Sequence, residues 1–167
     1  MNKSLLTIAL LLLSSCGFHL RGLADIPDWL NNIAIIVDNG NRELEPLLNA
    51  QLQSYHVRVS PSKTKAQYWL VIENDSFQKQ ITNVSASTTP RQYLLLYTVQ
   101  FSLIKNKGET ILSNNTVSVN RQFTLNNDRI LGSDYEEITF KREMERDAVS
   151  LILSRVSTAH QGVNYAH

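Results

Sequence analysis

The chain has 167 residues, with 16 Lys and Arg, 15 Asp and Glu, and a single Cys. One Cys cannot form an internal disulfide or a zinc cage of thiolates, so disulfide-rich scaffolds and zinc ribbons are excluded. A net charge of +1 without a basic run gives no electrostatic footprint for a nucleic acid, and an apolar content of 43% argues against disorder. The length suits one domain with its own core.

The N-terminus has the features of a secretory leader. The apolar run over residues 5–13 has the length of a signal-peptide core and is too short for a membrane span, which needs about 20 residues. Residues 13–16 (Leu-Ser-Ser-Cys) are similar to the lipobox of bacterial lipoproteins, in which the Cys is acylated and the chain is cut just before it. We therefore predict a cleaved signal peptide over 1–15 and lipid attachment at Cys16. The alternative is a secretory signal with an incidental Cys.

A lipid on Cys16 would hold the protein at a membrane without a basic patch. Buried methylenes contribute about 0.8 kcal/mol each, so two or three acyl chains anchor a protein stably. Gly17, and not an acidic residue, follows the Cys. By resemblance to Gram-negative lipoproteins, this favours the outer membrane over the inner one. Residues 16–32 are predicted to be the lipidated N-terminal segment.

The next segments predict a strand and then a helix. Residues 33–37 form a short β-branched run closed by turn-forming residues, which is typical of a buried strand. From Glu43 the apolar period changes to that of an amphipathic helix, with Pro46 near its first turn, where a missing N–H costs little. Val57 and Val59 could start another short extended piece.

Long strands are predicted in the middle of the chain. One runs from Tyr68 towards Ile81, and residues 83–90 are expected to form an exposed loop. Apolar and polar residues then alternate over 93–103, and the turn at 105–108 leads into a returning antiparallel strand that is irregular near Asn114.

The last element is predicted to be a helix over about 135–159, capped by Ser133 or Asp134. Its apolar residues recur at helical spacing: Phe140, Met144, Ala148, Leu151, Ile152 and Val156. The charged residues between them are expected to face solvent. These patterns indicate a small sheet flanked by two helices. We predict a single domain over 33–160 and a short tail over 161–167.

The sequence has almost no signals for catalysis. It has no nucleophile elbow, phosphate-binding Gly-rich loop or His-Glu-x-x-His motif, and its four His are scattered. A triad from Ser133, Asp134 and His56 would be a chance combination. We predict a protein that is not an enzyme and needs no metal or cofactor, apart from the acyl anchor on Cys16.

One strand has more apolar residues than a one-sided sheet needs. Residues 93–97 (Tyr-Leu-Leu-Leu-Tyr) are apolar on both faces. Leu94 and Leu96 could be covered by the segment around Trp29 and Leu30, or could be exposed singly, which is common. The other interpretation is that part of the second face lies against another protein.

The segment Cys16–Gly22 (Cys-Gly-Phe-His-Leu-Arg-Gly) resembles the opening of the LptE family of lipopolysaccharide-assembly lipoproteins. Later segments follow in the family's order: the strand and amphipathic helix, the strand from Tyr93 to Phe101, the strand ending in Arg121-Gln122-Phe123, and the acidic opening of the last helix. The resemblance implies an α+β two-layer sandwich, with two helices packed on a mainly antiparallel four-stranded sheet.

The resemblance also implies a function. LptE-like proteins sit inside the lumen of the outer-membrane barrel LptD, act as its plug and assembly factor, and help to deliver lipopolysaccharide to the outer leaflet. The chain is accordingly expected at the outer membrane, lipid-anchored on the periplasmic side. Contact with lipopolysaccharide phosphates would need cations, for which the candidates are Arg91, Arg121, Arg129 and Lys79. An alternative is an outer-membrane lipoprotein that binds a lipid or another amphiphile without a barrel partner.

Overall fold

The computed structural model describes residues 26–83, 91–125 and 130–159. Its elements in chain order are β1 (Asn32–Asn39), α2 (Leu44–Ser54), β2 (Arg58–Val59), a 3-10 turn (Lys63–Lys65), β3 (Tyr68–Asn83), β4 (Arg91–Lys105), β5 (Thr110–Leu125) and α3 (Ile130–Thr158). Signal peptide, lipid attachment site and C-terminal tail lie outside the described residues, as does most of the loop predicted over 83–90.

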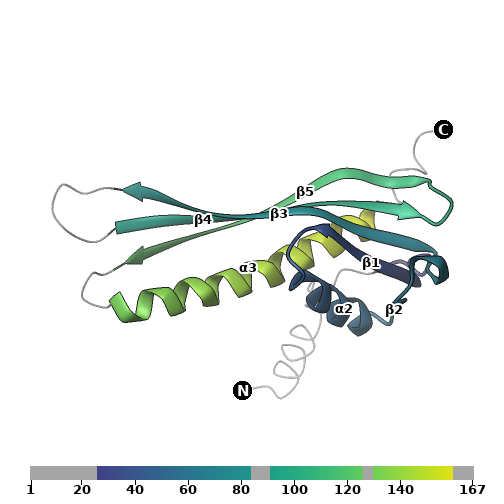
Figure 1. Ribbon diagram of the computed structural model, residues 1–167, viewed down its shortest axis with the longest axis horizontal. Coiled ribbons are helices and arrows are strands. Elements are labelled where there is room, and N and C mark those ends of the chain that lie inside the picture. The colour runs from purple at the N-terminus through teal and green to yellow at the C-terminus, as the bar shows by residue number, and fades with distance from the viewer. Residues whose placement is uncertain (1–25, 84–90, 126–129, 160–167) are drawn as a thin grey trace, which may run out of the picture.

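The strands form one sheet in the order β2-β1-β3-β4-β5. Strand β1 is parallel to both β2 and β3, whereas β3, β4 and β5 pair antiparallel. In Figure 1 both helices lie on the same side of this sheet, with α2 beside β1 and β2 and the longer α3 running along β4 and β5. The predicted two-layer α+β sandwich is therefore confirmed.

The sheet has five strands and not the predicted four. The additional strand is β2, whose two residues pair with Asn32 and Ile33 of β1 after the chain has returned through α2. A two-residue strand cannot show the alternation by which strands are recognised in a sequence. Pairing with β1 therefore becomes visible only in the tertiary structure.

Helix α2 agrees with its prediction: it starts after Glu43, and its residues Leu44, Leu48 and Leu52 are fully buried. Helix α3 differs at its start, because it begins at Ile130 and includes Ser133 and Asp134. The prediction that one of these two residues is the N-cap is therefore wrong. Ser and Asp are preferred at N-caps, but inside a helix each costs less than about 0.7 kcal/mol relative to Ala, so a helix can continue through them.

The buried stripe of α3 also differs in one position. Leu151 is 43% exposed, whereas Val149 and Leu153 are fully buried. Helix α3 packs against β4 and β5 and also touches α2. Its buried stripe is therefore wider than that of a helix that packs against the sheet alone. Helical spacing in the sequence gives the period at which buried residues recur, but it does not show which residues lie in the middle of the buried stripe and which lie at its edge.

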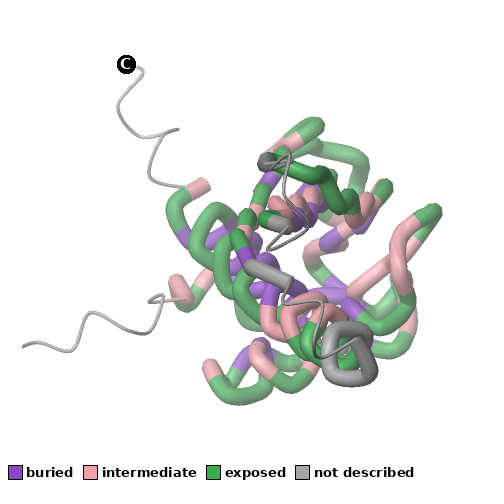
Figure 2. Tube along the Cα trace, turned by 90° about the vertical axis from the view of Figure 1, so that its left-hand side faces the viewer, coloured by how far each residue is buried: buried purple, intermediate pink, exposed green. Residues whose placement is uncertain are grey.

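The core lies between the sheet and the helices, where Figure 2 shows the buried residues gathered. On β4 the odd-numbered residues from Leu95 to Leu103 are all fully buried. Leu30 belongs to this core, and the ring of Trp29 packs at 5.0 Å from that of Tyr68 on the helix side. These two residues therefore do not cover the opposite face, and that explanation for Leu94 and Leu96 is wrong.

Candidate functional site

Two of the four cations predicted to contact lipopolysaccharide have described side chains. Lys79 on β3 and Arg121 on β5 both pair with Leu95 of β4, so the three residues form one row across the sheet. This row lies on the helix side, because Leu95 faces the core. The side chain of Arg91, at the first position of β4, and the whole of Arg129 lie outside the described residues, as does Cys16. Alternating side-chain direction along β3 and β5 thus brings together two residues that are far apart in sequence.

Lys79 is held between α3 and an aromatic pair. Its ammonium group forms an ion pair with Glu137 of α3. The same group lies 4.7 Å from the ring centroid of Tyr93 and 5.6 Å from that of Phe123. The two rings stack on each other at 5.3 Å. Cation–π attraction and the ion pair therefore both fix the position of the ammonium group.

Arg121 binds two carboxylates of α3. Its guanidinium forms an ion pair with Glu143 and a second one, at 3.0 Å, with Asp147. It also lies 5.9 Å from the ring centroid of Phe140. Asp147 and Glu143 raise the pKa of the Arg121 guanidinium, which stays charged. A planar group with several donors is suited to two such partners at once.

Both cations therefore tie α3 to the sheet. An anionic ligand would have to share them with Glu137, Glu143 and Asp147, or displace these carboxylates. The predicted contact with lipopolysaccharide stays a prediction for all four cations. The ion pairs give Lys79 and Arg121 a structural role that the charge pattern of the sequence did not reveal.

A cavity of about 350 Å³ lies beside this row of residues, lined by Phe77, Glu137, Ile138 and Lys141. Ile138 is 51% exposed, and two other large apolar residues, Ile81 and Tyr135, are also exposed in β3 and the N-terminal part of α3. This end of the helix layer is therefore an open surface with apolar and charged residues side by side.

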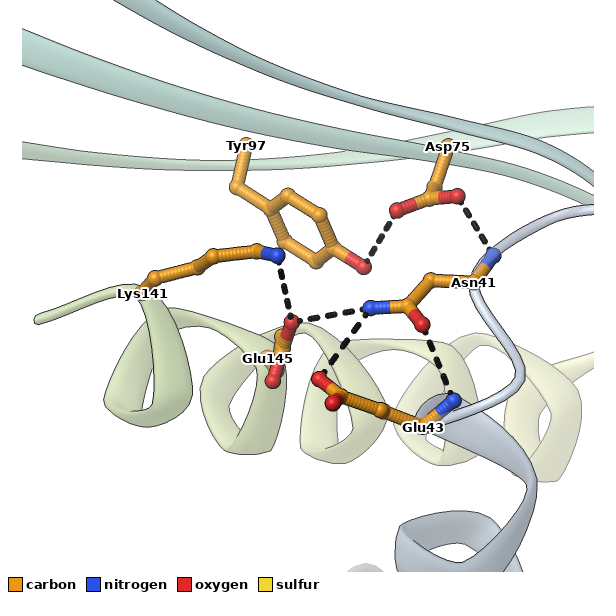
Figure 3. A network of polar contacts seen from close by, with 6 residues as sticks. All are labelled: Asn41, Glu43, Asp75, Tyr97, Lys141 and Glu145. Atoms are coloured by element: carbon orange, nitrogen blue, oxygen red, sulfur yellow. Dashed lines mark hydrogen bonds and ion pairs between the residues drawn. The ribbon is translucent and has the colours of Figure 1, made fainter. Parts of the chain in front are cut away.

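A second polar cluster joins α3, the sheet and the loop before α2 (Figure 3). At its centre, the Asn41 backbone N–H donates to Asp75 at 2.6 Å and the side-chain amide donates to Glu145 at 3.2 Å. Tyr97 donates its hydroxyl hydrogen to Asp75, with 2.9 Å between the oxygens. Sequence reasoning missed this cluster. The available signal was Asp75, a carboxylate at a position of β3 that faces the core beside Val99.

Burial governs the electrostatics of this cluster. It is the main reason that the pKa of Glu145, which is 2% exposed, is raised, and nearby Glu43 and Asp75 raise it further. Lys141, whose ammonium group is 3.7 Å away, and the hydrogen bond from Asn41 act in the opposite direction. Burial followed by the hydrogen bond to Asp75 raises the pKa of Tyr97, so its hydroxyl remains a donor.

The loop at this cluster is closely packed. A Cβ at Gly40 would lie 2.8 Å from Cγ2 of Ile72 and 3.3 Å from Cγ1 of Val37. Glycine therefore allows the loop to approach the sheet closely enough for Asn41 to reach Asp75. Within the described ranges there is no group of three or more His, Cys, Asp or Glu arranged to hold a metal, and no helix there is long and apolar enough to cross a membrane.

Residues 30–156 match the model of a family described as LptE, lipopolysaccharide-assembly. The chain belongs to the LptE family. This membership confirms the resemblance and gives the chain a role in lipopolysaccharide assembly. The LPS-assembly lipoprotein LptE of Pectobacterium atrosepticum is 24% identical over 154 residues, which cover 92% of this chain and 83% of that protein.

Solved structures of lipoproteins share the LptE-like fold. The solution structure of lipoprotein B from Nitrosomonas europaea aligns with a TM-score of 0.72 and 23% identity, covering 90% of this chain and 97% of that one. A minor lipoprotein from Acinetobacter baumannii aligns with a TM-score of 0.66 and 19% identity, covering 78% and 93%. At this identity the likeness concerns the fold.

Proposed function

We propose that this LptE-family chain is an outer-membrane lipoprotein that plugs an LptD-like β-barrel, assists its assembly and takes part in delivering lipopolysaccharide to the outer leaflet. In this proposal an acyl anchor on Cys16 holds it on the periplasmic side. The observation that carries the proposal is the family match over 30–156, which spans the sandwich from Leu30 to Val156.

The chemistry of the described residues agrees with a binding role. The charged side chains on the helix side are engaged with one another, as for Lys79 with Glu137 and Arg121 with Asp147. Covalent catalysis needs a nucleophile with a base held beside it, and these ion pairs do not provide that arrangement. A protein of this kind works by fitting a partner.

Affinity purification of the full chain from native membranes tests the proposal. After gentle detergent extraction, we expect an outer-membrane barrel of much greater mass to be recovered and identified by mass spectrometry. Recovery of the chain alone would contradict the proposal. Cells depleted of the chain should in addition contain less folded barrel in the outer membrane.

The cations remain candidates for direct contact with lipopolysaccharide. Arg91, Arg121, Arg129 and Lys79 would each meet a phosphate by a charge-assisted hydrogen bond. Binding of purified lipopolysaccharide should weaken when these residues are replaced one at a time by Gln. Ser118→Gln on the opposite face serves as the control, and equal binding by all five variants would remove these residues from the proposal.

The cavity beside Phe77 and Ile138 favours one alternative, an amphiphile-binding lipoprotein that acts without a barrel. Its exposed apolar wall could accept an alkyl chain, while Lys141 could meet a polar head. The alternative predicts saturable binding of a short-chain detergent below its micelle concentration, and loss of that binding in Ile138→Glu. It also predicts that the full chain recovers no barrel from native membranes.

A further inference from the structure

One face of the sheet carries no helix among the described residues. Complete rows of paired residues cross β3, β4 and β5 on this face, and the register of three consecutive rows fixes nine residues. We call them the neutral face: Ser76, Thr98 and Ser118; Gln78, Leu96 and Asn120; Gln80, Leu94 and Gln122. Lys79 and Arg121, which alternate with them along β3 and β5, bind α3, so these nine residues lie on the opposite side of the sheet. Figure 1 shows α3 on one side of the sheet only.

The neutral face contains no ionisable side chain. The rows between its residues, on the helix side of the same strands, carry Asp75, Lys79 and Arg121. A sheet face that meets only water ordinarily carries charged residues, which keep sheets soluble and prevent their association. On the helix side, by contrast, Lys79 pairs with Glu137 and Arg121 pairs with Asp147. Glu73, which accepts a hydrogen bond from Ser102 further along the strands, lies beyond the neutral face.

Leu94 and Leu96 lie side by side in the middle of the neutral face. Both are half-buried by their neighbours, and neither belongs to the core cluster or to the residues packed against it. Amide and hydroxyl side chains surround them, of which Gln78, Asn120 and Gln122 are exposed. Two apolar residues surrounded by uncharged polar groups have the composition of the centre of a protein interface, where charged residues are depleted.

The same composition excludes other occupants. An anionic lipid headgroup needs cations, and the neutral face has none. Two copies packed face to face would bury the amides of Gln78, Gln80, Asn120 and Gln122 against each other around four leucines, which is costly unless every amide finds a partner. A polar, hydrated protein wall supplies partners for the amides directly or through water.

We infer that the neutral face is the surface by which this protein docks against the inner wall of its barrel partner. This inference rests on the proposed function. The interior of a transmembrane β-barrel is polar, which matches the amides, and apolar sockets in it would receive Leu94 and Leu96. Strand spacing of about 4.8 Å gives the nine positions an area of about 300 Å², so they form the centre of a larger contact, since stable interfaces bury about 800 Å² on each partner.

The test compares the full chain with single variants in native membranes. Leu96→Lys places an unpaired charge in the contact, so barrel recovery should fall by at least about tenfold. Leu151→Lys is the matched control: Leu151 is 43% exposed on α3, and its variant should recover as much barrel as the wild type. Gln80→Lys, which retains both leucines, should also lower recovery and guards against a folding defect in Leu96→Lys. Both neutral-face variants should unfold within about 3 °C of the wild type.

The outcomes separate this inference from the proposed function. If the wild type recovers no barrel, the proposed function fails. If the wild type recovers the barrel, and Leu96→Lys and Gln80→Lys recover as much of it as the wild type, the docking surface lies elsewhere. In that case only this inference is overturned. Loss in Leu151→Lys alone would place the contact on the helix side and would also overturn it.

A photo-crosslinking residue at position 120 gives a direct readout. In place of Asn120 it should join the chain to the barrel, whereas the same group in place of Ser150, which is exposed on α3, should not. A product of twice the chain's mass would identify a second copy as the occupant, and crosslinked lipopolysaccharide would identify the lipid. Either product without the barrel overturns the inference.

Discussion

The hydroxyl of Tyr97 on β4 donates a hydrogen bond of 2.9 Å to Asp75 on β3, where Asp75 also accepts the Asn41 backbone N–H at 2.6 Å. One carboxylate thus joins two strands to the loop before α2. Tyr97 is fully buried, so the pair is a polar link inside an otherwise apolar layer. It fixes that loop in one position relative to the sheet.

Replacing Tyr97 by Phe should lower the free energy of unfolding by about 1–3 kcal/mol, because Asp75 loses a donor where water has little access. Urea unfolding measures the difference. In Asp75→Asn the one remaining oxygen can accept the Asn41 N–H while the new amide donates to the Tyr97 hydroxyl oxygen, so a smaller loss is expected there. A Tyr97→Phe protein as stable as the wild type would mean that the link contributes nothing.

Glu145 makes stability depend on pH. Its pKa is raised in the folded protein above the ordinary value of 4.5, first by burial. Because the folded protein holds the proton more tightly, the stability from this group is complete below pH 4.5 and is lost as pH rises through the raised pKa. Glu145→Gln keeps an acceptor for Asn41 but does not ionise. Its free energy of unfolding should therefore increase relative to that of the wild type as pH rises.

The difference in unfolding free energy between Glu145→Gln and the wild type isolates this group from other carboxylates. It should increase from pH 4 to pH 7 when measured by urea unfolding at about every half unit. Leu151→Gln, an exposed change of a residue that does not ionise on the same helix, should show no such trend. A difference that is constant with pH would indicate that Glu145 titrates alike in both states.

Neighbouring leucines of β4 should differ in their contribution to stability. Leu95 is fully buried in the core, so Leu95→Ala should cost about 2–5 kcal/mol. Leu94 is half-buried on the neutral face, and Leu94→Ala should cost about 1 kcal/mol or less in the isolated protein. Thermal or urea unfolding of the two variants checks this, and equal costs would contradict the assignment of faces.

Arg121 and Asp147 should be coupled weakly, because both side chains are partly exposed. A double-mutant cycle with Arg121→Gln and Asp147→Asn should give an interaction of about 0.2–1 kcal/mol that decreases at high salt. The comparable cycle between Arg121 and Glu136, which form no ion pair within the described part of the chain, should give about zero. A value independent of salt would argue for packing of the guanidinium on Phe140 instead.

Cys16→Ser should abolish acylation, because the hydroxyl does not replace the thiol as the lipid acceptor. We expect uncleaved or soluble protein and loss from the outer-membrane fraction, with the folded domain unaffected. Mass spectrometry of the wild type should show the added lipid mass. Unchanged fractionation of the variant would remove the anchor from the proposed function.

Local patterns were sufficient for the long elements. The alternation over 93–103 and the helical spacing after Glu43 place β4 and α2 correctly, because a strand or helix with one buried side must repeat apolar residues at its own period. The opening segment Cys16–Gly22 and the order of elements also sufficed for the family, which the match over 30–156 confirms.

The tertiary structure alone decided which residues meet. Pairing of β2 with β1, the centre of the buried stripe of α3, and the partners of Lys79 and Arg121 depend on how elements distant in sequence pack. The sequence alone showed that β4 is apolar on both faces, but only the sheet register revealed that the residues around Leu94 and Leu96 are uncharged. The reason is physical: periodicity is set by neighbours along one chain segment, whereas partners across strands and layers are set by contacts that no single segment contains.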